Sequence, residues 1–298
     1  MRRLFIEFDK AGAEWVVVAY LSGDANMLAV VESGESPHPK TGAFITGVSE
    51  ELIIKESKIV GLNTDPDKVL ALREEHLPEL LTGDFFLPRS MSIRQMGKKS
   101  NHGLNYDESY VTFSLINEML EAEAKRVINL YRTVAYPGIP IWYTTIKEKL
   151  RKDRTLENCF GRKRIFRDAW GPDLFRAAYA QVPQSTVFDI TRIGMEKITD
   201  DVSKEMWELD ILSQVHDSVL TQYPIADLQA MARVCVTVGL DYLNPLLVYN
   251  SKEFKIATEA KVGWNWGHME PILLSEDVDA VAESIAAAIE RLDEQEEG

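Results

Sequence analysis

Two aspartates, Asp9 and Asp217, have the positions in the sequence that most directly suggest chemistry. Asp9 ends the strand-like run "RLFIEFD" (3–9), and Asp217 lies inside the apolar run "LSQVHDSVLTQ" (212–222). A charge there costs stability unless a turn exposes it or a positive group pairs with it. If both strands belong to one sheet, the two carboxylates form a set of hard oxygen ligands suited to Mg²⁺. Two such ions can stabilise both the attacking and the leaving oxygen of a phosphoryl transfer. Taken singly, each aspartate is more often an ordinary turn or cap residue.

A second pattern lies in "RQMGKKSNHGLNY" (94–106), where Arg94, Lys98, His102 and Tyr106 recur every four residues. On a helix this spacing puts them on one gently drifting face. Such a strip matches a nucleotide laid along the helix, with phosphates on the two cations and the base or sugar near the two rings. The alternative is a solvated basic helix with a half-buried tyrosine.

The elements that must position these residues follow from local signals. The predicted elements are a strand over 3–9, a loop over 33–44 that holds His38, a helix over 90–106, a strand–turn–strand over 156–166, a long helix over 172–206 and a hairpin over 209–223 with His216 and Asp217 near its tip. Helices dominate, and the few strands lie towards the two ends of the chain. We therefore expect an α+β fold with a small sheet built from distant segments, plus a mostly helical part.

Composition fits a folded globular chain. The chain has 298 residues, of which 45% are hydrophobic and 27% charged. It contains no apolar run of about 18 residues, so no membrane span is expected. Acidic residues interrupt any secretory signal near the N-terminus, and the 2 cysteines make neither a disulfide framework nor a zinc site. We expect a cytoplasmic protein, in a bacterium or a virus-infected host cell.

Charge is unevenly distributed along the chain. The net charge of −14 argues mildly against nucleic acid as a partner, but residues 276–297 alone contribute −8 of it. Residues 147–167 are basic and end near "GRKR" (161–164), a turn that could contact a phosphate backbone. Both stretches could equally be solvated helix faces. No Gly-rich phosphate loop is present, which argues against a plain nucleotide-binding protein.

The order of these features resembles the polymerase motifs of family A DNA polymerases, the DNA polymerase I-like group. "FDKAGAEWVVVAYLSGD" (8–24) resembles motif A, "RQMGKKSNHGLNY" resembles motif B, and "QVHDSV" (214–219) resembles motif C. Between B and C, "CFGRKR" (159–164) and "QVPQSTVFDI" (181–190) resemble two further family segments. "VGWNWG" (262–267) resembles the end of the family's polymerase region. Any one motif is weak, whereas five in the right order are a specific signal.

The resemblance implies roles for the matching positions. Asp9 and Asp217 would hold two Mg²⁺ ions and be catalytic. Residues implied to bind the dNTP are Arg94, Lys98 and His38 at the triphosphate, His102 and Tyr106 at the base or sugar, and Glu14 at the sugar, where it would favour DNA synthesis over RNA synthesis. Residues implied to bind DNA are Gln184 and His216 near the primer end, with Arg162 and Arg164 on the basic turn.

Several positions depart from the family pattern. Lys10, Ala11 and Gly12 replace Tyr-Ser-Gln in motif A, and His102 replaces an aromatic Phe or Tyr, which puts sugar discrimination in doubt. Residues 45–88 form an insert between motifs A and B to which we assign no role. The metal ligands and the triphosphate contacts survive, so we expect an active enzyme.

In domain terms, the resemblance implies a discontinuous palm (1–35 and 151–298) with a small antiparallel sheet, and mostly helical fingers (36–150) between its parts. The thumb, the upstream palm and any exonuclease domain would lie outside the chain. We therefore expect a truncated or split enzyme, in which a separate chain supplies the thumb and upstream palm.

The expected function is template-directed DNA synthesis, with primer–template DNA and dNTPs as ligands. Two alternatives stay open. One is a relative of the single-subunit RNA polymerases, against which Glu14 argues. The other is a catalytically degenerate DNA-binding replication subunit, whose DNA binding would be indifferent to Asp217→Ala.

Overall fold

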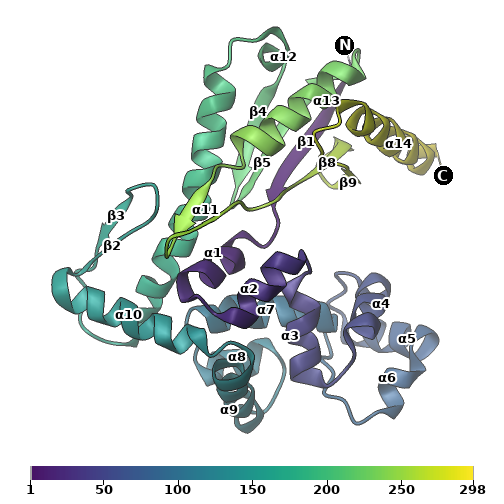
Figure 1. Ribbon diagram of the computed structural model, residues 1–298. Helices are drawn as coiled ribbons and strands as arrows, with labels where there is room; N and C mark the ends of the chain where they lie inside the picture. Colours follow the sequence, from purple (N-terminus) through teal and green to yellow (C-terminus); the bar gives the residue numbers. More distant parts are fainter. Residues whose placement is uncertain (1, 298) are drawn as a thin grey trace. The chain divides into compact units, whose positions relative to one another are not determined.

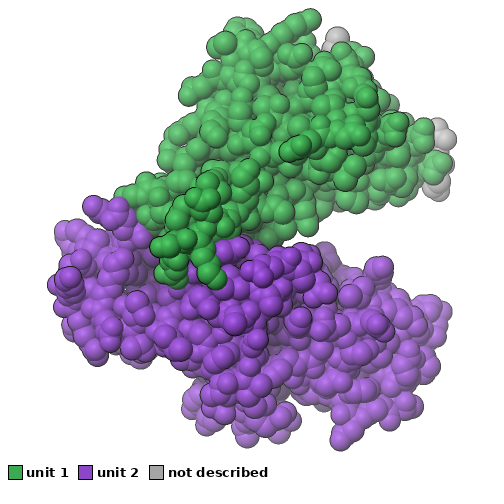
Figure 2. Space-filling view, in the orientation of Figure 1, with its two compact units in different colours: residues 1–14, 158–162, 184–298 green, residues 15–157, 163–183 purple. Residues whose placement is uncertain are grey.

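The computed structural model describes residues 2–297, with side chains described through residue 295 (Figure 1). The chain forms two compact units, shown in two colours in Figure 2. Unit 1 comprises residues 1–14, 158–162 and 184–298, and unit 2 comprises residues 15–157 and 163–183. These bounds differ from those of the predicted palm and fingers, which remain a prediction.

Unit 1 is built on a five-stranded sheet in the order β4-β5-β1-β8-β9. All neighbouring strands in it run antiparallel. The strands are β1 (Arg3–Lys10), β4 (Asp210–Val215), β5 (Ser218–Pro224), β8 (Thr258–Asn265) and β9 (His268–Ile272). The first strand of the chain thus lies between strands more than 200 residues further on, because Phe8 pairs with both Val219 and Ala260. The α+β prediction, with a small antiparallel sheet from distant segments, is confirmed.

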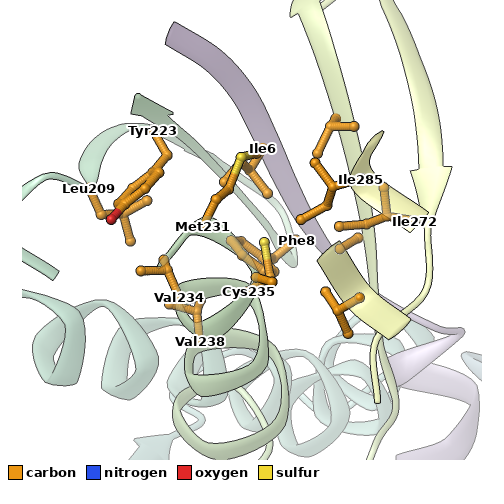
Figure 3. Close-up of a cluster of buried hydrophobic side chains, with 14 of the residues drawn as sticks. Ile6, Phe8, Leu209, Tyr223, Met231, Val234, Cys235, Val238, Ile272 and Ile285 are labelled. Carbon is orange, nitrogen blue, oxygen red and sulfur yellow. The ribbon is translucent and has the colours of Figure 1, made fainter. Parts of the chain in front are cut away.

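The alternation of β1 decides which face of the sheet is buried. Leu4, Ile6 and Phe8 are fully buried, whereas Phe5, Glu7 and Asp9 on the opposite face are partly exposed. Figure 3 shows Ile6 and Phe8 packed with Met231 and Cys235, which come from α13. The helices of unit 1 beyond α11 are α12 (Lys204–Trp207), α13 (Leu228–Val236), the π-helical turn η2 (Thr237–Tyr242) and α14 (Val278–Glu297). A short hairpin pairs β6 (Leu247–Tyr249) with β7 (Lys252–Phe254).

Unit 2 is mostly helical. Its elements are α2 (Ala25–Ser33), α3 (Pro37–Thr46), α4 (Glu50–Val60), α5 (Pro66–His76), α6 (Pro78–Thr82), α7 (Ile93–Asn105), α8 (Tyr110–Ile116), α9 (Glu121–Leu130), η1 (Tyr131–Ala135), α10 (Gly138–Asp153), β2 (Thr155–Glu157) and β3 (Lys163–Ile165). The helix α1 (Ala13–Ser22) starts in unit 1, and α11 (Pro172–Asp200) starts in unit 2; each ends in the other unit. None of the described helices has the length and hydropathy of a membrane-spanning segment.

Two predicted elements differ from the structure. The predicted loop over 33–44 is wrong, because α3 begins at Pro37 after the N-cap position Ser36 and ends at Thr46, before the C-cap residue Gly47 with its φ of 80°. Proline at the first helical position has a φ already suited to a helix, so the composition that indicated a loop marks a helix start. The long helix predicted to reach residue 206 ends at Asp200, and α12 follows as a separate turn.

Candidate active site

Asp9 lies at the end of β1, on the face of the sheet opposite the hydrophobic core. Its Oδ1 accepts a hydrogen bond of 2.9 Å from the backbone N–H of Lys10. Because Phe8 pairs with Val219, the next positions along the two antiparallel strands bring Asp9 to the start of β5, at Ser218. The residue before Ser218 is Asp217, so the register places the two predicted metal ligands at one end of adjacent strands.

Asp217 occupies the two-residue turn between β4 and β5, as predicted from the sequence. The preceding residue, His216, has φ 54°, a left-handed conformation that is uncommon for a residue with a side chain and is found in tight turns. Burial raises the pKa of the Asp217 carboxyl, and the nearby Asp9 and Glu14 carboxylates raise it further. The turn therefore holds a carboxylate in a negative environment, where bound positive charge would be favourable.

Glu14 contributes to this environment from the first turn of α1, where it is half-buried. Oxygen ligands of this kind suit Mg²⁺, which is bound through one or two carboxylates while keeping several waters. Residues 2–295 contain no cluster of three or more His, Cys, Asp or Glu side chains arranged to hold a metal. The residues that fit a divalent cation are the pair Asp9 and Asp217. The pKa of Asp217 is raised first by burial and then by the Asp9 carboxylate, whose negative charge a bound cation would offset.

Lys10 is the residue in this region to which sequence reasoning assigned no role beyond a departure from the motif. Its side chain is buried, and its Nζ donates hydrogen bonds of 2.8 Å to the Ile256 carbonyl and 2.7 Å to Thr258 Oγ1. Burial lowers the pKa of Lys10 to about 7, although the Asp217 carboxylate opposes the shift. The alternation of β1 could have predicted that Lys10 is buried, because residue 10 falls on the core-facing side of the strand.

The predicted basic strip lies on α7 in unit 2. Ser92 begins the helix, where its side chain accepts a hydrogen bond of 3.2 Å from the Gln95 N–H. Seven residues of α7 are buried, and Arg94, Lys98 and His102 are not among them. The predicted spacing therefore puts Arg94, Lys98 and His102 on the face of α7 that is not buried, with Tyr106 at the C-cap position and its ring 5.5 Å from that of His102.

His38 lies against this strip, because α3 packs closely on α7. At Gly97 of α7 a Cβ atom would lie 2.1 Å from the His38 carbonyl oxygen, so only glycine allows the approach. Burial first, and then the cations Arg94 and Lys98, lower the pKa of His38 to about 4. The structure therefore brings together the three residues predicted to contact a triphosphate, although the sequence indicated a loop for His38.

One predicted DNA-binding residue of unit 1, Arg162, is bound to the buried carboxylate of Asp189. Arg162 donates to it from Nε (2.8 Å) and Nη2 (2.6 Å), and Asn158 donates from Nδ2 (2.8 Å). Arg192 adds a bond of 3.2 Å from Nε. Arg162 keeps 44% of its side chain exposed. These four residues form what we name the Asp189 cluster, which holds residues 158–162 against α11.

The remaining predicted DNA-binding residues are accessible. Gln184 is exposed on α11, and His216 is exposed at its turn. Arg164 of β3 is also exposed, with its guanidinium carbon 4.8 Å from the centroid of the Phe166 ring. No contact in unit 1 or unit 2 tests their predicted roles, which stay predictions.

Comparison with solved structures identifies the fold. The polymerase domain of Pol1 from M. smegmatis, in complex with a DNA primer-template and dNTP, superimposes with a TM-score of 0.65 at 19% sequence identity. The match covers 88% of this chain and 40% of that chain. The fold is therefore that of a DNA polymerase domain.

Comparison of sequences gives the family. The model of DNA polymerase family A matches residues 88–268, which is more than half of the chain. The chain belongs to DNA polymerase family A, as the motifs indicated. Its relatives include the thermostable DNA polymerase I of Thermus aquaticus, 24% identical over 274 residues, and DNA polymerase I of Chloroflexus aurantiacus, 22% identical over 275 residues. The matches cover 88% and 91% of this chain but only 27% and 25% of those proteins, so the chain spans about a quarter of their length.

Proposed function

We propose that this chain carries the nucleotidyl-transfer centre of a template-directed DNA polymerase. The observation that supports this most directly is the convergence of Asp9 and Asp217 at one end of two adjacent strands, where burial and then the Asp9 carboxylate raise the pKa of Asp217. Family membership makes DNA synthesis the expected chemistry and disfavours the alternative of an RNA polymerase relative. The primer 3′-oxygen attacks the α-phosphorus of the dNTP, and pyrophosphate leaves.

In this proposal Asp9 and Asp217 hold two Mg²⁺ ions. When bound, these ions lower the pKa of the primer 3′-hydroxyl and stabilise the charge that develops at the phosphate. The negative charge that Asp9 and Glu14 place around Asp217 favours cation binding at this turn. Neighbouring carboxylates repel one another when they are ionised, which gives the site a preference for the metal-bound state.

Unit 2 supplies the proposed contacts to the nucleotide. Arg94 and Lys98 project from the exposed face of α7 and offer donors to the β- and γ-phosphates, with His38 beside them on α3. The His102 and Tyr106 rings lie next along the same face, where the base or sugar is expected. Glu14, at the start of α1, is proposed to exclude a ribose 2′-hydroxyl.

The DNA contacts are proposed to come from Gln184, His216, Arg162 and Arg164. Arg162 is the best supported of these, because Asp189 fixes one edge of its guanidinium while the side chain stays 44% exposed. An arginine held in this way loses little conformational freedom when it binds a phosphate oxygen.

Because the chain spans about a quarter of the length of its relatives, the test below also supplies the upstream part of a family A polymerase. A cytoplasmic setting is consistent with both cysteines being free thiols. The competing proposal is a degenerate subunit that binds DNA without synthesis, which the buried Lys10 ammonium near Asp217 specifically favours.

Primer extension tests these proposals. A labelled primer–template is incubated with Mg²⁺ and dNTPs, with the wild-type chain or with Asp217→Ala, alone and with a chain that carries the upstream part of a family A polymerase. Extension by the wild type and its loss in Asp217→Ala support the polymerase assignment. DNA binding that Asp217→Ala leaves unchanged, with no extension under either condition, establishes the degenerate subunit instead. A matched series of rNTPs tests the role of Glu14.

A further inference from the structure

The insert at residues 45–88 contains a buried ion pair that also forms hydrogen bonds to the start of α7. Glu56 of α4 is 0% exposed and Arg73 of α5 is 3% exposed. Arg73 donates to Glu56 Oε1 from Nη2 (2.6 Å) and from Nε (3.1 Å). A buried pair of this kind is weak evidence for stability by itself, because desolvation offsets most of its attraction. Its remaining hydrogen bonds show what else it does.

Those bonds all go to the segment that leads into α7, residues 88–93, which we name the α7 entry segment. Arg73 donates to the Pro88 carbonyl from Nη1 (2.6 Å) and to the Met91 carbonyl from Nη2 (3.0 Å). The other oxygen of Glu56, Oε2, accepts the N–H of Ile93 at 3.0 Å. Ile93 is the first residue of α7, so a carboxylate of the insert satisfies one of the N–H groups that a helix leaves unpaired.

A third charged residue holds the same segment from another direction. Glu118, in the turn after α8, accepts the backbone N–H of Arg89 (2.5 Å) and of Ser90 (3.2 Å) through Oε2, and the Ser90 hydroxyl through Oε1. Five backbone groups of the α7 entry segment are therefore bound by side chains. Arg94, the first cation of the nucleotide strip, follows this segment directly.

We propose that the insert at residues 45–88 is a positioning device, in which Glu56 and Arg73 fix the first turn of α7 and hence the grip of Arg94 and Lys98 on the triphosphate. This inference rests on the proposed function, because it takes α7 as the nucleotide-binding helix. Glu56 and Arg73 contact no substrate in this account and act through the backbone of residues 88–93. Positioning contacts of this kind matter because displacements of about 1 Å can cost roughly 10²-fold in rate.

The test compares Glu56→Gln with the wild type and with Glu51→Gln, which changes an exposed glutamate in the first turn of the same helix. Glutamine offers one acceptor and an NH₂ group, so it cannot accept from both Arg73 and Ile93. We expect the KM for dNTP to rise by about tenfold in Glu56→Gln, with the affinity for primer–template unchanged. Hydrogen exchange should quicken at the first amides of α7, and Glu51→Gln should match the wild type in every measurement.

A second variant covers the case in which Glu56→Gln does not fold. Glu56→Leu combined with Arg73→Leu replaces the buried pair by apolar side chains, a change that often leaves stability intact but removes all three bonds to the entry segment. If α7 exchanges as in the wild type in these variants, or if dNTP affinity is unchanged while only the melting temperature falls, the insert is a structural addition and the proposal is wrong. The exchange measurement needs no nucleotide, so it decides this proposal even if the wild-type chain binds no dNTP and the proposed function fails.

Discussion

Asp189 and Arg162 are joined edge to edge, with the Nε and Nη2 groups of the guanidinium donating to the two oxygens of the carboxylate at 2.8 Å and 2.6 Å. The carboxylate is 2% exposed, whereas the arginine is 44% exposed. Burial would raise the pKa of Asp189, but hydrogen bonds from Arg162, Asn158 and Arg192 outweigh burial and lower it. The pair therefore combines a buried anchor with an accessible cation at the basic turn.

This asymmetry predicts that replacing Arg162 destabilises the protein more than replacing Arg192. Arg162→Ala leaves a buried carboxylate without two of its donors, so we expect a clear fall in the free energy of unfolding. Arg192→Ala removes one longer bond of 3.2 Å, and we expect a smaller fall. Urea denaturation at neutral pH measures both. If both variants lose the same free energy of unfolding, the edge-to-edge geometry of Arg162 and Asp189 adds no extra stability.

The close approach of α3 and α7 predicts a severe effect of one methyl group. In Gly97→Ala the new Cβ would lie 2.1 Å from the His38 carbonyl oxygen and 2.9 Å from the Gly42 nitrogen, and both are backbone atoms. The helices must separate, so we expect destabilisation of about 1–3 kcal/mol and weaker dNTP binding. Gly171→Ala is the matched control, since nothing lies within 4 Å of its added Cβ. Thermal denaturation of both variants gives the comparison, and a Gly97→Ala protein as stable as the control contradicts the packing described here.

The strands that carry Asp9 and Asp217 and the basic helix could be predicted from sequence because their signals are local. Alternation marks β1, the turn between two apolar runs marks the hairpin of Asp217, and a spacing of four marks α7. The pairing of β1 with both β5 and β8 follows from contacts across more than 200 residues, and no local pattern gives it. The expectation that Asp9 and Asp217 lie together came from the resemblance of the motifs to a family and not from local physical signals.

The insert and α3 show where local signals fail. The Ser-Pro start of α3 combines an N-cap position with a proline at the first helical position, yet its glycine and proline content is equally typical of a loop. In the insert, the role of Glu56 depends on Arg73 and on the Ile93 N–H, which lies 37 residues away along the chain. A charged residue within an amphipathic helix gives no sign in the sequence that it is fully buried.

The environment of His38 predicts a distinctive pH dependence. Burial and the cations Arg94 and Lys98 lower its pKa to about 4, so the folded protein holds the neutral imidazole well below the pH at which the unfolded chain protonates it. Between about pH 6.5 and the folded pKa the unfolded state binds more protons, and stability therefore falls as pH falls through this window. We expect His38→Gln to lose less stability than the wild type between these two pH values. NMR titration of the 5 histidines checks the assignment, and a His38 midpoint near its usual value overturns it.

The carboxylates near the hairpin turn predict that ionised Asp217 makes the metal-free protein less stable and that a bound cation reverses this effect. Burial and the carboxylates of Asp9 and Glu14 raise the pKa of Asp217, so its ionised form at neutral pH disfavours the metal-free fold. We expect Asp217→Asn to stabilise the metal-free protein by about 1 kcal/mol, as substitutions that relieve functional strain commonly do. Millimolar Mg²⁺ should then raise the melting temperature of the wild type, because a ligand that binds only the folded state stabilises it, and should leave Asp217→Asn unchanged.

The control for this prediction is Asp241→Asn, which removes an exposed carboxylate of unit 1 and should respond to Mg²⁺ as the wild type does. Calorimetry with and without a chelator separates the two effects, since the gain from Asp217→Asn appears only in the chelated sample. If Mg²⁺ does not change the melting temperature of the wild type, and if Asp217→Asn is less stable, the raised pKa of Asp217 reflects burial alone. Asp217 would then be an ordinary turn residue, and Asp9 and Asp217 would not form a metal site.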